Sequence, residues 1–160
     1  MATEETGEAI DARAALVRWA LGELGVQDPN KYFRVACVEF ADRGLEHEKS
    51  WCGIFVLAGL HALGLVDWQW STDPRRPGFV FRLTVTRDPQ PGDVAVFRVG
   101  RDGKDVWHHA IVEYVRNGRV YTIDGNVMMY PKEGVMTKER PIDSNVTFYS
   151  IGSLVRDAAR

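Results

Sequence analysis

The chain has 160 residues, of which 45% are hydrophobic and 26% charged, a balance typical of one globular domain with its own core. Its formal net charge of −2 provides no general attraction to nucleic acid or to an anionic membrane surface. No apolar stretch approaches the length of a membrane-spanning helix, so we expect a protein that is not embedded in a membrane and does not bind nucleic acid.

The N-terminal half predicts helices. Residues 1–10 are acidic and are expected to be disordered or extended; they lack the basic and apolar regions of a signal peptide, which predicts synthesis in the cytoplasm. Apolar residues then recur at helical spacing from Asp11 to Leu24, and Pro29 is suited to open a second helix ending at Gly44. Residues 67–91 hold four of the seven prolines and predict a long irregular connection, with one short strand or helix near residues 80–85.

A third helix is predicted to begin at Cys52, because an apolar segment follows this residue as far as Gly64. It has few polar residues, which indicates a buried central helix. The partial positive charge at a helix N-terminus favours the thiolate, so Cys52 is a candidate nucleophile. The alternative is that Cys52 is a small residue of the core, the usual place of a cysteine thiol.

Beyond Pro91-Gly92 the sequence changes to a β pattern. Helices first and an antiparallel sheet second define an α+β fold, with a single domain over residues 11–153 and an exposed tail over residues 154–160. The predicted strands span residues 93–99, 108–115, 119–124 and 146–151.

The two cysteines, Cys37 and Cys52, do not form a metal-binding pattern with the four histidines. A disulfide between them is not expected, because Cys37 falls on an apolar helical face. We therefore expect no metal and no cofactor. His47 and His61 are expected to lie in a solvated loop and at the end of the central helix, outside any catalytic site.

A catalytic cysteine needs a base, and that base needs a group to orient it. The candidate bases are the adjacent His108 and His109, and the candidate orienting groups are Asp124 and Asn126. Side chains alternate along a strand, so the turn between the two strands decides which histidine shares a face with Asp124 and Asn126. A two-residue turn at residues 117–118 favours His109 and a three-residue turn at residues 116–118 favours His108; both are common, so the spacing leaves the two alternatives open. In isolation, residues 124–126 also suit a simple turn.

Four motifs in order resemble the CHAP domain, the cysteine, histidine-dependent amidohydrolases/peptidases related to NlpC/P60 proteins in the papain-like superfamily. They are Trp-Cys-Gly-Ile-Phe-Val at 51–56, Pro-Gly-Asp-Val-Ala-Val-Phe at 91–97, His-His-Ala-Ile-Val-Glu at 108–113 and Ile-Asp-Gly-Asn at 123–126. The resemblance covers about residues 14–151, and the cysteine precedes the histidine, unlike the order in the circularly permuted lipid acyltransferase relatives.

The resemblance implies a papain-like fold, with N-terminal helices packed on a C-terminal antiparallel sheet, and a cysteine hydrolase. It implies that Cys52 is the nucleophile and that His108, two residues before the small Ala110, is the base. His109 remains the alternative base. The family's orienting pair falls on Asp124 and Asn126, although Asp124 is shorter than the glutamate often found there.

The implied substrate is the peptide stem or another amide of bacterial peptidoglycan, as for lysins, tail-associated wall hydrolases and secreted effectors. The site of action would then be the cell wall or periplasm, reached through a phage tail, a holin or a secretion system. Trp51 and Trp107 flank the proposed nucleophile and base, which makes them candidates for substrate binding. The rival hypotheses are a papain-like protease or amidase with another substrate, and a non-catalytic domain that keeps the fold and binds a partner.

Overall fold

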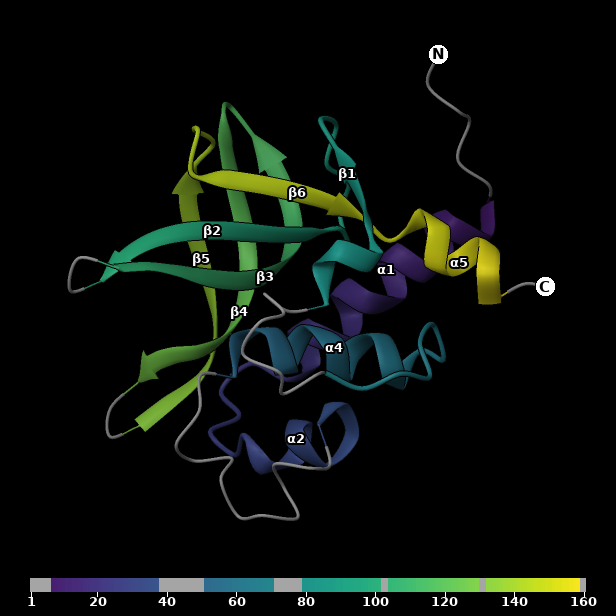
Figure 1. The fold of residues 1–160 in the computed structure, drawn as a ribbon, viewed down its shortest axis with the longest axis horizontal. Coiled ribbons are helices and arrows are strands. Elements are labelled where there is room, and N and C mark those ends of the chain that lie inside the picture. The colour runs from purple at the N-terminus through teal and green to yellow at the C-terminus, as the bar shows by residue number, and fades with distance from the viewer. Residues whose placement is uncertain (1–6, 38–50, 71–78, 102–103, 130–131, 159–160) are drawn as a thin grey trace.

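The computed structural model describes residues 7–37, 51–70, 79–101, 104–129 and 132–158. Helices occupy much of the first part and strands most of the second, which confirms the α+β class (Figure 1). The helices are α1 (Gly7–Gly22), α2 (Asn30–Ala36), α4 (Cys52–Ala62) and α5 (Gly152–Ala158), with a 3₁₀ turn at Val80–Arg82. The strands are β1 (Thr84–Thr86), β2 (Val94–Arg101), β3 (Lys104–Arg116), β4 (Arg119–Met129), β5 (Lys132–Pro141) and β6 (Val146–Ser150).

The strands form one sheet in the order β1-β6-β2-β3-β4-β5, and each neighbouring pair is antiparallel. Three successive hairpins therefore place β2, β3, β4 and β5 side by side. Helix α4 packs against β3 and β4 on one side and against α2 on the other, so it lies between the sheet and α2 (Figure 1). Among the described residues, no helix is both long enough and apolar enough to span a lipid bilayer.

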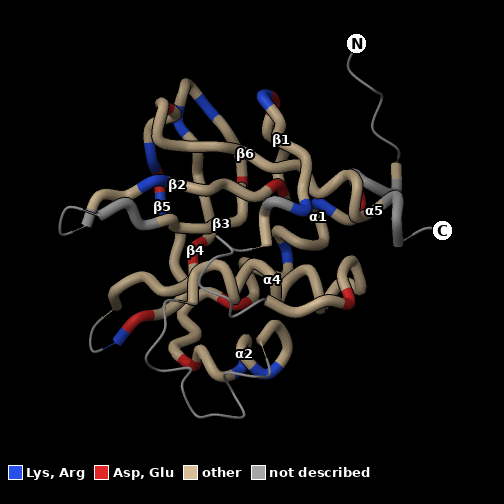
Figure 2. The backbone as a smooth tube through the Cα atoms, viewed as in Figure 1, with Lys and Arg blue, Asp and Glu red and all other residues tan. Residues whose placement is uncertain are grey.

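Helix α4 is the centre of the core. It contains no Lys, Arg, Asp or Glu (Figure 2), and its residues from Cys52 to Leu60 are all buried. A helix that is apolar on every side needs neighbours on every side. Gly59 allows close contact with α1, because a Cβ at this position would lie 2.7 Å from the ring of Trp19.

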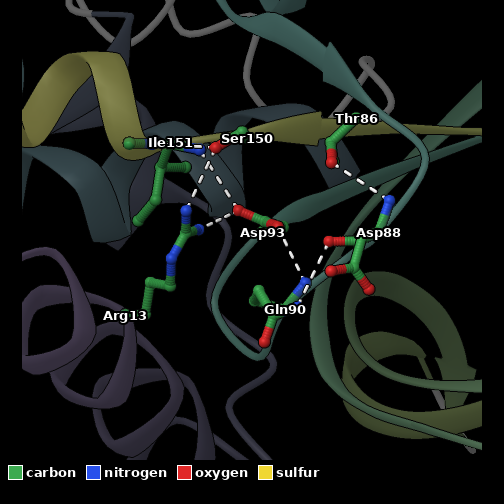
Figure 3. A network of polar contacts seen from close by, with 8 residues as sticks. Arg13, Thr86, Asp88, Gln90, Asp93, Ser150 and Ile151 are labelled. Atoms are coloured by element: carbon green, nitrogen blue, oxygen red, sulfur yellow. Dashed lines mark hydrogen bonds and ion pairs between the residues drawn. The ribbon is translucent and has the colours of Figure 1, made fainter. Parts of the chain in front are cut away.

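The Pro-Gly-Asp motif joins α1 to the sheet through a buried ion pair (Figure 3). Asp93 is 1% exposed and accepts hydrogen bonds from the guanidinium of Arg13 and from the backbone N–H groups of Gln90 and Ile151. Gly92 has a φ of +90°, and a Cβ there would lie 2.7 Å from the backbone of Arg13. Gly92 and Asp93 are thus both required where α1 packs on the sheet. Burial raises the pKa of Asp93 despite the charge of Arg13.

Several predicted elements differ from those in the structure. β5 was not predicted, and the predicted strand 119–124 extends to Met129. The segment near residues 80–85 contains both a 3₁₀ turn and the start of β1. The prediction of an exposed tail from residue 154 is wrong, since helix α5 buries Leu154 and Val155. The prediction that residues 1–10 are disordered or extended is wrong for residues 7–10, which form the first turn of α1; residues 1–6 lie outside the described residues. The second predicted helix ends at Ala36 rather than Gly44 in the described part of the chain, and residues 38–44 lie outside the described residues.

Candidate active site

Cys52 is the first residue of α4 and is 4% exposed. Trp51 caps the helix, and the backbone N–H of Phe55 donates to the Trp51 carbonyl at 2.9 Å, which closes the first turn. Backbone N–H groups in a first turn have no partner within the helix, so they point beyond its N-terminus and favour negative charge there. Cys37 and Cys52 are both thiols, in agreement with the prediction that they form no disulfide.

Two histidines of β3 contact this thiol. His109 Nδ1 lies 3.9 Å from Cys52 Sγ. Burial by itself would raise the pKa of the Cys52 thiol, but the hydrogen bonds and positive charges of His108 and His109 outweigh burial and lower the pKa well below its ordinary value. The structure therefore favours a thiolate at position 52.

His108 is held by Asp124 on the neighbouring strand. Its Nε2–H donates to Asp124 Oδ2 at 2.7 Å, which leaves Nδ1 as the ring nitrogen available to the thiol. Burial lowers the pKa of His108, but the hydrogen bonds and charges of Asp124 and Cys52 have the larger combined effect and raise it to about 9. His108 is therefore an imidazolium at neutral pH, paired with a carboxylate on one side and a thiolate on the other.

Asp124 is fully buried and has further polar partners. Thr122 Oγ1 donates to Asp124 Oδ1 at 2.5 Å, and Arg140 Nη2 donates to Asp124 Oδ2 at 2.7 Å. Burial would raise the pKa of this carboxyl group, whereas the hydrogen bond from His108 and the charge of Arg140 lower it below its usual range. Asp124 thus remains ionised although it is buried.

Asn126 lies two residues beyond Asp124, within β4. The Asp-Gly-Asn sequence is not a turn between elements, because the strand continues to Met129 with a register shift against β5 between Asp124 and Val127. Asn126 has a φ of +61°, in the left-handed region that asparagine tolerates better than most residues. The structure thus places Asp124 against His108, while Asn126 forms part of an irregularity in the strand.

The rings around His109 are apolar. Phe79 stacks on the imidazole at 5.8 Å, and Trp70 meets it edge-on at 5.5 Å. The Nε2 atom of His109 is buried and has no hydrogen-bond partner among the described residues. Gly53 makes room for this arrangement, since a Cβ there would lie 2.5 Å from Trp70 Cη2 and 3.2 Å from His109 Nδ1.

The two candidate substrate-binding tryptophans differ in exposure. Trp51 is 3% exposed and stacks on Tyr32 at 5.7 Å, so its ring packs in the core. This burial weighs against the predicted contact of Trp51 with substrate. Trp107 is 47% exposed and directly precedes His108 in β3, which leaves its side chain accessible beside the site.

Two residues that support the site, Thr122 and Arg140, were not predicted from the sequence. Thr122 is two positions from Asp124, and the alternation of side chains along a strand was a signal that could have identified it. Arg140 lies in β5, which was not predicted, and no motif marks it. Among the described residues, no group of three or more His, Cys, Asp or Glu side chains is arranged to hold a metal ion.

The site combines a cysteine at a helix N-terminus with a histidine and a carboxylate on adjacent strands. This arrangement is typical of papain-like cysteine hydrolases. The sequence profile of the CHAP domain matches residues 27–126, more than half of the chain, and the protein belongs to this family. CHAP domains are generally amidases or peptidases and typically act on peptidoglycan. No curated protein and no solved structure matched the chain.

Proposed function

We propose that this protein is a cysteine amidase or endopeptidase that hydrolyses amide bonds of bacterial peptidoglycan. The observation that carries the proposal is the 2.7 Å hydrogen bond between His108 and Asp124 beside Cys52. A nucleophile, a base and an oriented carboxylate are the groups that acyl transfer through a thiol needs. The peptidoglycan substrate rests on membership of the CHAP family.

Cys52 acts as the nucleophile in this proposal. Its thiolate Sγ attacks the amide carbonyl carbon, and the C–N bond then breaks as the imidazolium of His108 gives its proton to the leaving nitrogen. The amine departs and the acyl group remains on sulfur as a thioester. Water then attacks the thioester, His108 accepts its proton, and the carboxylic acid leaves while Cys52 returns to the thiolate.

His108 is the proposed base, because it donates to the carboxylate of Asp124, whereas Nε2 of His109 has no hydrogen-bond partner among the described residues. An imidazolium formed during the reaction is stabilised by the buried carboxylate of Asp124, which also fixes the ring. The described neighbours of His109 include the rings of Trp70 and Phe79, which offer no comparable charge. His109 supports the thiolate through Nδ1.

The backbone N–H of Cys52 is the proposed donor to the oxyanion. It belongs to the first turn of α4, where no carbonyl of the helix accepts from it. The exposed ring of Trp107 is the proposed wall for the peptide stem or muropeptide. We further propose that the enzyme acts in the cell wall or periplasm, after delivery through a phage tail, a holin or a secretion system.

Mass analysis of digested sacculi tests the proposal. Wild-type protein is expected to create new muropeptide termini, either a free N-terminus on a stem released from the sugar or a new end within the stem or cross-bridge. Cys52→Ala is expected to create none, whereas Cys37→Ala, which removes the other buried thiol, is expected to keep the activity. Cleavage of a protein substrate without new muropeptide termini would instead support the rival protease, and no turnover of either substrate would support a binding domain.

A further inference from the structure

The carboxylate of Asp124 is shared by two cations. His108 Nε2 and Arg140 Nη2 both donate to the same oxygen, Oδ2, each at 2.7 Å. The other oxygen, Oδ1, accepts from Thr122 Oγ1 at 2.5 Å, and Arg140 Nη1 donates to that same hydroxyl oxygen at 3.0 Å. Arg140 therefore holds Asp124 directly through one oxygen and indirectly, through Thr122, by the other.

Arg140 is itself fixed in place. It belongs to β5, where it pairs with Val120 of β4, and its guanidinium lies 4.4 Å from the ring centre of Phe97 in β2. A guanidinium that stacks on a ring and donates through two nitrogens has little freedom to rotate. Its side chain is 25% exposed, so the charge is partly shielded from water.

We propose that Arg140 is a positioning residue for catalysis, which holds the buried carboxylate of Asp124 ionised and oriented toward His108. The inference rests on the proposed function, since it concerns the same histidine and thiol. Arg140 lies outside residues 27–126, so the family match does not include it. Arg140 donates to Asp124 and Thr122, and it acts on His108 through Asp124.

The charges around Asp124 give the direction of the effect. Among the described residues they are His108 from β3, Arg140 from β5 and, through His108, Cys52 from α4. Removing the cation Arg140 makes the buried carboxylate harder to ionise, so the pKa of Asp124 rises. It also leaves His108 as the principal cation beside Asp124, so His108 holds its proton to higher pH. Both limbs of the pH–activity profile are therefore expected to move upward together.

The test compares kinetic pH profiles of Arg140→Met and Arg140→Lys on soluble peptidoglycan fragments. Arg140→Met is expected to lower kcat at least tenfold with KM within about twofold, and to shift both limbs upward by about half a pH unit or more. Arg140→Lys keeps the charge and is expected to restore the position of the limbs, with part of kcat. Thr122→Val is a milder variant expected to lower kcat without moving the limbs as far.

Arg119→Met is the matched control. Arg119 makes an exposed ion pair with Glu139 between the same two strands, so the variant removes an arginine from β4–β5 pairing without touching Asp124. The inference would be overturned if Arg140→Met had the same kcat and the same pH limbs as Arg119→Met. It would also be overturned if Arg140→Met lost kcat but its pH limbs did not move. If Cys52→Ala retained wild-type activity, the proposed function itself would fail, which separates the two outcomes.

Discussion

His108 and Asp124 lie on the same face of β3 and β4 because β3 contains one extra residue between them and the turn. The turn is the two-residue kind, with Arg116 paired to Arg119 and positive φ at Asn117 and Gly118. By itself it would place Asp124 on the His109 face. A register shift between Val112 and Tyr114 leaves Glu113 as a bulge and moves Asp124 to the His108 face.

This relationship predicts the effect of removing the charge of Asp124. Asp124→Asn keeps the shape but cannot stabilise the imidazolium of His108, so kcat is expected to fall by about 10²–10⁴-fold in steady-state assays on peptidoglycan fragments. Asn126→Gly, which keeps the left-handed backbone without strain, is the comparison and is expected to have the smaller effect. A larger loss in Asn126→Gly than in Asp124→Asn would assign the orienting role to Asn126.

The protonation states predict how reactivity depends on pH. Because the pKa of Cys52 lies well below its ordinary value, alkylation by iodoacetamide in a Cys37→Ala background is expected to remain fast under mildly acidic conditions. Hydrolysis is expected to fall as the pH rises through about 9, since His108 then lacks the proton that the leaving amine needs. His109→Val is expected to slow alkylation at low pH, because one donor to the thiolate is lost. An alkylation profile that rises only near the pKa of a free thiol would contradict this account.

A side chain at position 125 is expected to disturb the packing of helix α4 against strand β4. A Cβ at this position would lie 2.7 Å from Phe55 Cβ and 2.9 Å from Trp51 Cζ3. Gly125→Ala is therefore expected to lower the free energy of unfolding by about 1–3 kcal/mol and to lower activity, because α4 carries Cys52. Gly100→Ala is the control, since nothing lies within 4 Å of a Cβ there. Urea unfolding measures both variants, and equal stability would show that α4 is not held at this contact.

The buried pair of Arg13 and Asp93 predicts a loss of stability away from the active site. Arg13→Met leaves the carboxylate of Asp93 buried without its guanidinium, which is expected to cost about 3–5 kcal/mol in urea unfolding. Arg18→Met, on an exposed part of the same helix, is expected to change stability by less than about 0.5 kcal/mol. Equal stability of the two variants would mean that the pair contributes nothing to holding α1.

The sequence predicted the elements that carry strong local patterns. The Cys52 helix and the strand containing His108 and His109 are long, apolar segments, and the structure has both. β5 was not predicted, because its Lys, Glu, Thr and Arg residues alternate only weakly with apolar ones. Its pairing with β4 depends on the tertiary structure and leaves no local pattern in the sequence. The same holds for α5, which is too short for a helical pattern to be distinct.

The sequence predicted which residue types form the candidate site, but not on which face of the sheet Asp124 lies. Cys52, His108 and Asp124 were named from the motifs, and the structure brings them together. The face of Asp124 could not be derived from turn length, because the bulge at Glu113 reverses the alternation without any glycine or proline to mark it. Arg140 could not be identified from the sequence, since its role depends on β5, a strand that no clear sequence pattern predicts.

Trapping of the acyl-enzyme on Cys52 tests directly whether Cys52 is the nucleophile. Protein in the Cys37→Ala background is mixed with soluble peptidoglycan fragments, quenched in acid within milliseconds to seconds, and analysed by intact and peptide mass spectrometry. We expect a thioester adduct on the peptide that contains Cys52, its formation to match the rate of fragment cleavage, and neither adduct nor cleavage in Cys52→Ala. Cleavage at the wild-type rate by Cys52→Ala would show that Cys52 is not the nucleophile.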